Sequence, residues 1–370
     1  MIGQYARVLM IALGITATFI GCGEPGFVIP ADPSCRTCEI EVTTELSIGE
    51  SDGPGSLLGR PTYLAMDSLG RFWVSMLDYG FPFVFARDGT FIQQFGQPGE
   101  GPGEFRNAWV VEGLPGDSVL LSEGLSYLIA GPDLNIARRV ARAPVGQLMG
   151  LRVRSWPDDV LGLSLTHNAG SQASEAQHLD FSGDRLAVRS TLALATGSTA
   201  AVYRRVEPSG TGDLWVSDVT RYVLRRYGPE GSATDSLERK ADWFPAEETF
   251  RSVSPSQSPT ASVIGLRADP EGRLWVFTSR PRADWQKAWA GRSFPSGAAE
   301  VRVSSLPPDY ELWSTFVEVI DVAGRRVVVR QAIDGYVFAV LRHDLVATYT
   351  ELDTGVPVVT VHHLALVEKR

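Results

Sequence analysis

The sequence predicts an all-β fold, a β-propeller of six four-stranded blades, with seven blades as the alternative. The first observation behind this prediction is a hairpin-like segment that recurs along the chain. The second is the spacing of the units, about 40 to 55 residues, which is typical of propeller blades. The third is a single alternating strand before the first complete unit, which we expect to close the ring.

The recurrent segment reads as an apolar strand, a turn with Asp and Gly, and a second apolar strand carrying an aromatic residue. It occurs as LAMDSLGRFWV (64–74), as LRADPEGRLWV (266–276) and, more loosely, as VEPSGTGDLWV (206–216). Gly supplies the positive φ of the turn and Asp bonds its backbone, so each copy predicts a β-hairpin. We interpret residues 117–121 and 334–338 as degenerate second strands of further units.

Residues 40–48 alternate strictly between apolar and polar side chains, which predicts a strand with one buried face. An open propeller would leave an unpaired strand edge at each end of the sheet array. We therefore expect this N-terminal strand to join the last blade, next to the β-branched run that starts at 358. The propeller domain is accordingly predicted to span residues 39–370.

The first 21 residues predict an export signal, with a short cationic head, an apolar core and a small residue at the end. The apolar core is too short to span a bilayer, which takes about 20 apolar residues. The run from Phe19 to Cys22 resembles the lipobox of bacterial lipoproteins, although that family prefers Leu where Phe19 stands. The resemblance implies that Cys22 is lipidated and anchors the mature protein, and Gly23 resembles lipoproteins sent to the outer membrane. An ordinary cleaved signal with an incidental cysteine is the alternative.

Residues 22–38 are expected to form a membrane tether, because Pro, Gly and small residues dominate from 23 to 34. Two cysteines in this stretch, Cys35 and Cys38, most simply pair with each other in an exported chain. Free or intermolecular thiols are one alternative, and redox or metal chemistry is another. Haem attachment would need a His where Glu39 stands, and zinc would need ligands that no further Cys supplies.

Two further segments resemble a known family. The run FGQPGEGPGEF (95–105) is similar to the Gly-rich connector between blades of NHL-type six-bladed propellers. The run from Trp215 to Asp218, followed by Arg221–Val223 and Tyr227, resembles the blade pattern of the same family. The mature chain as a whole resembles lipid-anchored six-bladed propeller proteins of bacteria, except at 140–200. The functions of that family are diverse, so the resemblance implies a fold and a location but no reaction.

Composition and motifs disfavour several classes of function. The formal net charge is −9 and no basic run exceeds three residues, so we expect no nucleic-acid partner. No P-loop and no Gly-x-Ser-x-Gly elbow occurs. The histidines are scattered, and adjacent His362 and His363 face opposite ways on a strand, so no metal or cofactor site is identified. We interpret Asp67 and Asp269 as turn-building residues.

The candidate binding face comes from the largest departure from the repeat, an insertion at 277–316 that carries Trp285, Trp289 and Trp313. Aromatic residues are enriched among binding hot spots, but these three could equally pack the insertion onto the propeller. Strand order places the insertion on the same face of the disc as the 96–105 connector, which carries Glu100 and Glu104. Loop-rich faces favour pockets, so this face is the candidate for binding.

We therefore expect a non-catalytic propeller that is anchored in the bacterial cell envelope through lipid and binds a protein, a peptide or a glycan. The propeller would face the periplasm or the cell surface. One alternative is a metal-dependent hydrolase or lyase of the gluconolactonase kind, which needs a ring of Asp, Glu, Asn or His at the channel. The other alternative is a structural subunit of an envelope complex.

Overall fold

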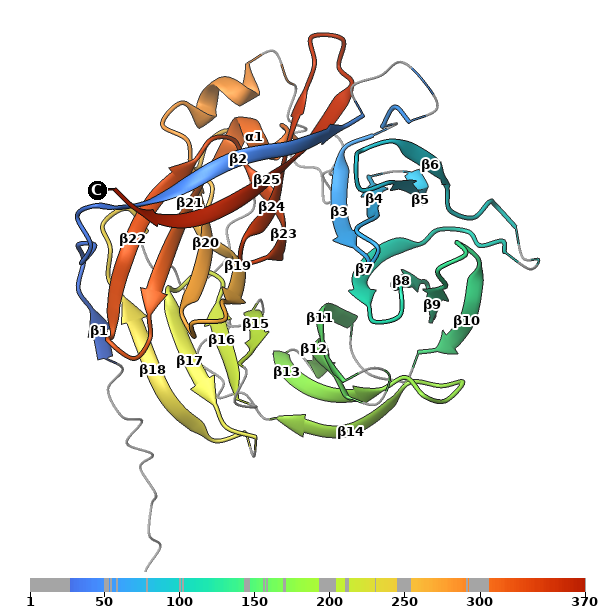
Figure 1. Cartoon of the computed structure of the whole chain (residues 1–370), viewed down its shortest axis with the longest axis horizontal. Coiled ribbons are helices and arrows are strands. Elements are labelled where there is room, and N and C mark those ends of the chain that lie inside the picture. Colours follow the sequence, from blue (N-terminus) through green and yellow to red (C-terminus); the bar gives the residue numbers. More distant parts are fainter. Residues whose placement is uncertain are drawn as a thin grey trace, which may run out of the picture.

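The computed structural model shows six β-sheets arranged as blades around a central axis (Figure 1). It describes residues 27–49, 53, 55–57, 59–77, 79–99, 101, 103–142, 147–155, 157, 159–168, 171–192, 204–209, 213–229, 231–244, 254–290, 292 and 306–369. The prediction of six four-stranded blades is confirmed. No helix in these ranges is long and apolar enough to cross a membrane.

Each blade is an antiparallel meander whose first strand lies nearest the centre of the ring (Figure 1). Blade 1 contains β3 (Pro61–Met66), β4 (Phe72–Met76), β5 (Tyr79–Phe85) and β6 (Phe91–Gln94). Blade 2 contains β7 (Trp109–Leu114), β8 (Ser118–Glu123), β9 (Ser126–Ala130) and β10 (Ile136–Ala141). Blade 3 contains β11 (Gln147–Ser155), β12 (Asp159–Asn168), β13 (Ser171–Asp180) and β14 (Ala187–Leu192).

The second half of the ring follows the same plan, with two additions from the N-terminal segment. Blade 4 contains β15 (Arg204–Pro208), β16 (Leu214–Asp218), β17 (Val223–Tyr227) and β18 (Ala233–Arg239), with β1 (Phe27–Ile29) added at its edge. Blade 5 contains β19 (Ser262–Ala268), β20 (Leu274–Pro281), β21 (Trp313–Asp321) and β22 (Arg326–Ile333). Blade 6 contains β23 (Val337–Arg342), β24 (Leu345–Glu351), β25 (Pro357–Glu368) and β2 (Cys38–Ile48).

The recurrent Asp builds the turn between the first two strands of a blade. Asp67 is 2% exposed, and its Oδ1 accepts hydrogen bonds from the backbone N–H groups of Leu69 (3.1 Å) and Arg71 (2.9 Å). Its Oδ2 accepts from the side chains of Arg71 (2.6 Å) and Trp73 (3.1 Å). Asp269 makes the same contacts with Arg273 and with Trp275. The carboxylate thus ties each turn to a buried tryptophan of its own blade, as expected for a turn-building residue.

The ring is closed by the N-terminal strand, as the alternation at 40–48 predicted. β2 pairs antiparallel with β25, and the two lie side by side in Figure 1. Ile40 is 1% exposed and lies in a core shared by blades 5 and 6. On the outer edge of β2, the Gln331 amide accepts a hydrogen bond from the Ile40 N–H (2.8 Å) and donates one to the Ile40 carbonyl (2.5 Å). The closing strand is therefore bonded on both edges.

Residues 27–37 also lie on the rim of the propeller, where we had expected the tether to continue to residue 38. The apolar strand β1 pairs in parallel with β18 and buries Ile29. The side chains of Arg239 and Glu318 are fully buried and paired (2.8 Å), and Arg239 also donates to the carbonyls of Pro30 and Ala31. Residues 27–31, which precede β2, thus cover the outer edge of blade 4. The predicted signal at 1–21 and Cys22 lie outside the described residues.

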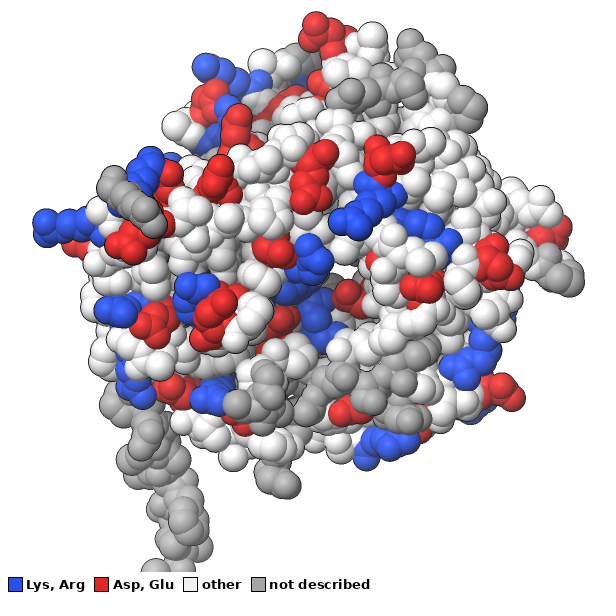
Figure 2. Space-filling model, viewed as in Figure 1, with Lys and Arg blue, Asp and Glu red and all other residues white. Residues whose placement is uncertain are grey.

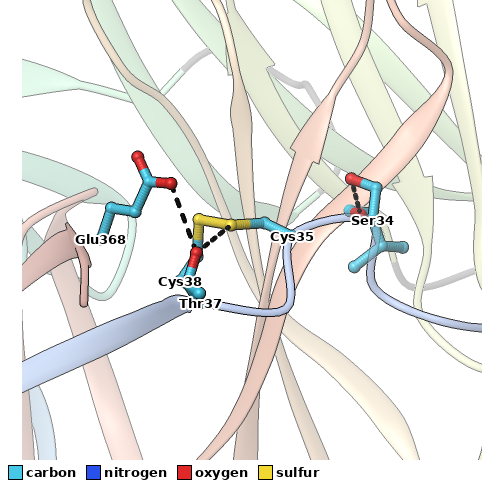
Figure 3. Close-up of a disulfide and its surroundings, with 6 residues drawn as sticks. Ser34, Cys35, Thr37, Cys38 and Glu368 are labelled. Carbon is cyan, nitrogen blue, oxygen red and sulfur yellow. Dashed lines mark hydrogen bonds between the residues drawn. A yellow bond between two sulfur atoms is a disulfide. The ribbon is translucent and has the colours of Figure 1, made fainter. Parts of the chain in front are cut away.

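A disulfide between Cys35 and Cys38 stands where this rim segment turns into β2 (Figure 3). Just before it, the backbone N–H of Ser34 donates to the carbonyl of Val327 in β22 (2.8 Å). Thr37, between the two cysteines, donates a side-chain hydrogen bond to Glu368 at the end of β25 (3.3 Å). The segment therefore runs from blade 5 to blade 6 through this turn.

Two parts of the ring differ from the repeat pattern. Residues 147–192, where the pattern is absent, still form blade 3, with a long β12–β13 hairpin paired from Val160 to Asn168. The Asp-Gly segment at 334–338 was interpreted as a degenerate second strand, and this is wrong. Gly335 has φ 87° and turns the chain from β22 into β23, the innermost strand of blade 6. The turn residues are the same for both kinds of connection, so the local pattern could not distinguish them.

Candidate binding site

A cleft of about 660 Å³ lies on the face of the ring that carries the connections between blades. Residues 107–109, at the end of the β6–β7 connector, form one side of the cleft. Residues 306–313, from the insertion between β20 and β21, form another, and Arg60 borders it from the β2–β3 connection. The insertion and the connector therefore reach the same cleft, in agreement with strand order.

The cleft is rich in aromatic side chains. Tyr63 and Trp109, on the innermost strands of blades 1 and 2, are 53% and 37% exposed. Tyr79, Tyr336 and Phe338 are partly buried around them. Tyr and Trp combine a large apolar surface with a polar group, which suits them to contact a ligand. Because both exposed aromatics stand on paired strands, they are held on a rigid part of the fold.

The cleft opens onto the central channel. Thr62, Tyr63, Trp109 and Phe338 line both the cleft and a cavity of about 280 Å³ between the innermost strands of the six blades. Figure 2 shows basic and acidic side chains gathered around the hollow at the centre of the disc. The site thus has an aromatic outer part and a charged inner part.

Among the side chains that the structure describes, Arg152, Arg205, Arg267 and Glu112 line the channel, and Glu207 lies beside two of these arginines. Arg152 pairs with Glu112 (2.8 Å) and with Glu207 (3.3 Å), and Arg267 lies 3.6 Å from the same Glu207 carboxylate. Burial lowers the pKa of Arg267 to about 10, so the group still carries its charge at neutral pH. The Glu207 carboxylate is therefore shared between Arg152 and Arg267, whereas Glu112 pairs with Arg152.

Arg205 is the third guanidinium of the channel, and it differs from the other two. Its Nε donates to the carbonyl of Ile264 (3.0 Å), and no carboxylate within the described ranges pairs with it. Burial lowers the pKa of Arg205, with the Arg152 charge acting in the same direction and the hydroxyls of Tyr336 and Tyr63 acting against it. Arginine keeps its proton in proteins, so the channel holds one cation in excess among these five groups.

A carboxylic acid, Asp309, also lines the cleft. Burial raises the pKa of Asp309, and the Arg60 charge partly opposes this shift. The Asp309 N–H donates to the Tyr349 hydroxyl (3.1 Å), which orients the chain at the start of the short helix α1 (Asp309–Leu312). Burial and the Asp309 charge together raise the pKa of Tyr336. The Tyr336 hydroxyl therefore stays protonated and can donate a hydrogen bond into the cleft.

The three tryptophans of the insertion are buried. Trp285 and Trp289 lie in a 3₁₀-helix, η2 (Trp285–Trp289), are each 8% exposed, and pack with Leu312 and Trp313. This corrects the expectation that they form an exposed contact surface, because they hold the insertion against α1 and β21. Trp313 is 9% exposed, packs against Tyr336 and borders the cleft.

Glu104 contributes to the fold of the β6–β7 connector. Its carboxylate accepts hydrogen bonds from the Gly101 N–H (2.8 Å) and from the Gln97 amide (3.2 Å). In the same connector Gly96 has φ +80°, and a Cβ there would lie 2.1 Å from the Phe105 ring, so the close packing requires glycine. Glu104 does not line the cleft, and Glu100 lies outside the described residues.

Within the part of the chain that the structure describes, no group of three or more His, Cys, Asp or Glu side chains could hold a metal ion. His362 contacts Thr44 (3.3 Å) and Thr348 (2.9 Å), whereas its neighbour His363 lies 3.6 Å from Asp344. The two histidines therefore serve separate local contacts, as their places on a strand predicted. The ligand set that a metal-dependent hydrolase would need is not found in these residues.

Comparison with known proteins shows the fold alone. No protein-family model and no curated protein matches the sequence. A solved member of the DUF4221 family from Bacteroides vulgatus has a TM-score of 0.53 at 9% identity, over 90% of this chain and 99% of that one. A Bacteroides fragilis structure described as a "putative exported protein" has a TM-score of 0.52 at 10% identity, over 93% and 99%.

A third similar structure is an inactive variant of virginiamycin B lyase from Staphylococcus aureus with quinupristin. It has a TM-score of 0.44 at 10% identity, over 87% of this chain and 99% of that one. The chain is thus a six-bladed β-propeller with similarly folded proteins in Bacteroides.

Proposed function

We propose that the protein is a ligand-binding propeller of the bacterial cell envelope, whose site is the cleft bordered by the β20–β21 insertion. The observation that carries the proposal is the pair of exposed aromatic residues, Tyr63 and Trp109, on the rigid innermost strands that line it. Sites built on strands hold their side chains more accurately than sites built on loops. The ligand is expected to be a peptide segment or a glycan.

The dimensions of the cleft support this assignment. Small-ligand sites typically have about 300 to 1,000 Å³, and the cleft has about 660 Å³. Exposed Tyr and Trp side chains lose little conformational entropy when they bind, because each has only two side-chain torsions. A ring or an apolar side chain of the ligand can therefore be buried against both aromatics at low cost.

The test is a binding screen with the mature protein on a glycan array and on a peptide library. The variants are Tyr63→Ala and Trp109→Ala, and the control is Leu69→Ala. Leu69 is 52% exposed in the β3–β4 turn, on the opposite face of the ring. We expect every reproducible ligand to lose about 10-fold or more in affinity with either cleft variant, since hot-spot aromatics cost more than about 1 kcal/mol on truncation. Ligands that bind both cleft variants as well as wild type would show that the site lies elsewhere.

The proposal includes anchoring of the mature chain through lipid on Cys22, in the outer membrane. Its support is the lipobox-like run before Cys22, together with a Cys35–Cys38 disulfide of the kind that persists in oxidising compartments. The export description of the Bacteroides fragilis structure points the same way. Two or three acyl chains give stable attachment where one would be marginal.

Fractionation of cells that express wild type or Cys22→Ala tests this anchor. We expect wild type in the membrane fraction, released by detergent, and the variant in the soluble or unprocessed fraction. Wild-type protein in the soluble periplasmic fraction without detergent would refute lipid anchoring and would leave the cleft assignment to be judged by the binding screen.

A further inference from the structure

Arg205, the channel arginine without a carboxylate partner among the described residues, lies where a ligand in the cleft could reach it. Arg205 lines the channel together with Tyr63, Trp109 and Phe338, and the last three also line the cleft. Tyr63 and Tyr336 lie near enough for their hydroxyls to act on the Arg205 charge. The guanidinium therefore lies at the inner end of the aromatic cleft.

The donors of Arg205 are largely available. Within the described part of the chain, only the Arg205 Nε has a hydrogen-bond partner, the Ile264 carbonyl, and the two Nη groups are not among the enclosed, unbonded polar atoms. They are therefore in contact with the open space of the channel. A planar guanidinium with free Nη groups is suited to donate two parallel hydrogen bonds to the oxygens of a carboxylate.

We propose that Arg205 binds the carboxylate of the ligand, while Tyr63 and Trp109 contact an aromatic or other planar ring next to that carboxylate. This inference rests on the proposed function and names the chemical class of its ligand. The ligand is an acid with one negative charge, since among the described side chains three arginines face two carboxylates in the channel. A phosphate dianion fits less well, because Glu112 and Glu207 lie in the same channel and would repel the second charge.

A carboxylate beside an aromatic ring can come from a free small acid or from the C-terminus of a peptide. The probes are therefore N-acetylphenylalanine and the tripeptide Ala-Ala-Phe, each compared with its C-terminal amide by titration calorimetry. We expect the acids to bind about 10- to 100-fold more tightly than the amides, as the loss of a charged hydrogen-bond pair implies. Equal affinity of both acids identifies a small acid as sufficient, whereas binding of the tripeptide alone identifies a peptide C-terminus.

The variants separate a binding role from a structural one. In Arg205→Gln we expect acid and amide to bind equally weakly, and in Arg205→Lys we expect an intermediate preference for the acid. The urea midpoint of Arg205→Gln should stay the same or rise, because the change removes a buried cation that repels Arg152. Arg326→Gln is the control, since Arg326 pairs with Asp321 on the exposed rim.

An acid preference that survives in Arg205→Gln would overturn the inference, as would equal binding of acids and amides by wild type. No binding of any of the four probes would also overturn it. In that case the array screen with Tyr63→Ala and Trp109→Ala still decides the proposed function, so the two failures can be told apart.

Discussion

Replacement of Ile40 by Ala tests whether the N-terminal strand closes the ring. Ile40 is 1% exposed and packs in the core between blades 5 and 6, where Trp275 and Phe277 are also buried. The change removes three carbon atoms, worth about 2.4 kcal/mol at ~0.8 kcal/mol for each buried group. The large rings around the site cannot collapse fully into the space, so a cavity cost is added. We expect the free energy of unfolding to fall by about 3 kcal/mol, within the usual range for Ile→Ala.

The assay is urea unfolding followed by tryptophan fluorescence, with the slope of the transition as a check on cooperativity. Val42→Ala is the matched control, because Val42 stands on the same strand and is 38% exposed. It should cost less than about 1 kcal/mol. Deletion of residues 39–49 should cost more than Ile40→Ala or abolish folding, since it removes the whole ladder with β25. If Ile40→Ala is as mild as Val42→Ala, or if the deletion leaves stability unchanged, β2 does not close the ring.

Three further predictions concern single residues. Asp67→Ala should lower the free energy of unfolding by about 3 kcal/mol, because it leaves the buried indole N–H of Trp73 without its acceptor. The control Asp88→Ala, in an exposed turn, should lower it by less than about 1 kcal/mol. Similar urea midpoints for the two variants would contradict this prediction. Trp285→Ala should cost about 3 kcal/mol, and an unchanged urea midpoint with lost ligand binding would instead restore its role as a contact residue. Because burial raises the pKa of Asp309, this group stabilises the fold below its unfolded pKa and that contribution is lost as pH rises through the folded value. Asp309→Asn should therefore raise the urea midpoint at pH 7 relative to wild type and not at pH 3, and the reverse order would contradict the assignment.

The propeller could be predicted from the sequence because its hairpins depend on local chemistry. Asp67 and Asp269 each satisfy their own turn and their own tryptophan, so the same letters recur wherever the same contacts form. The alternation at 40–48 predicted the closing strand, but the predicted face is buried fully only at Ile40 and Ile48. Val42 on the same face is 38% exposed, and the register with β25 shifts between Thr44 and Leu46. Blade 3 lacks these signals, and its strands are paired through a long hairpin without the recurrent Asp and Trp.

The site was harder to predict because its residues come from different blades. Tyr63, Arg205 and Gly265 each stand immediately before the first position of the three repeat copies, and all three line the channel. Alignment of the repeats could have revealed this shared position. The tryptophans of the insertion predicted a contact surface at Trp285 and Trp289, whereas in the structure these side chains pack in a buried cluster of the insertion. Composition cannot distinguish a buried aromatic cluster from an exposed one.

The most direct test of the central claim is a crystal structure of the mature protein grown with the tightest ligand from the array screen. The account predicts electron density for the ligand in the cleft, against Tyr63 and Trp109 and within reach of residues 306–313. Ligand density on the opposite face, near the β3–β4 turn, or on the outer strands of the blades would contradict it.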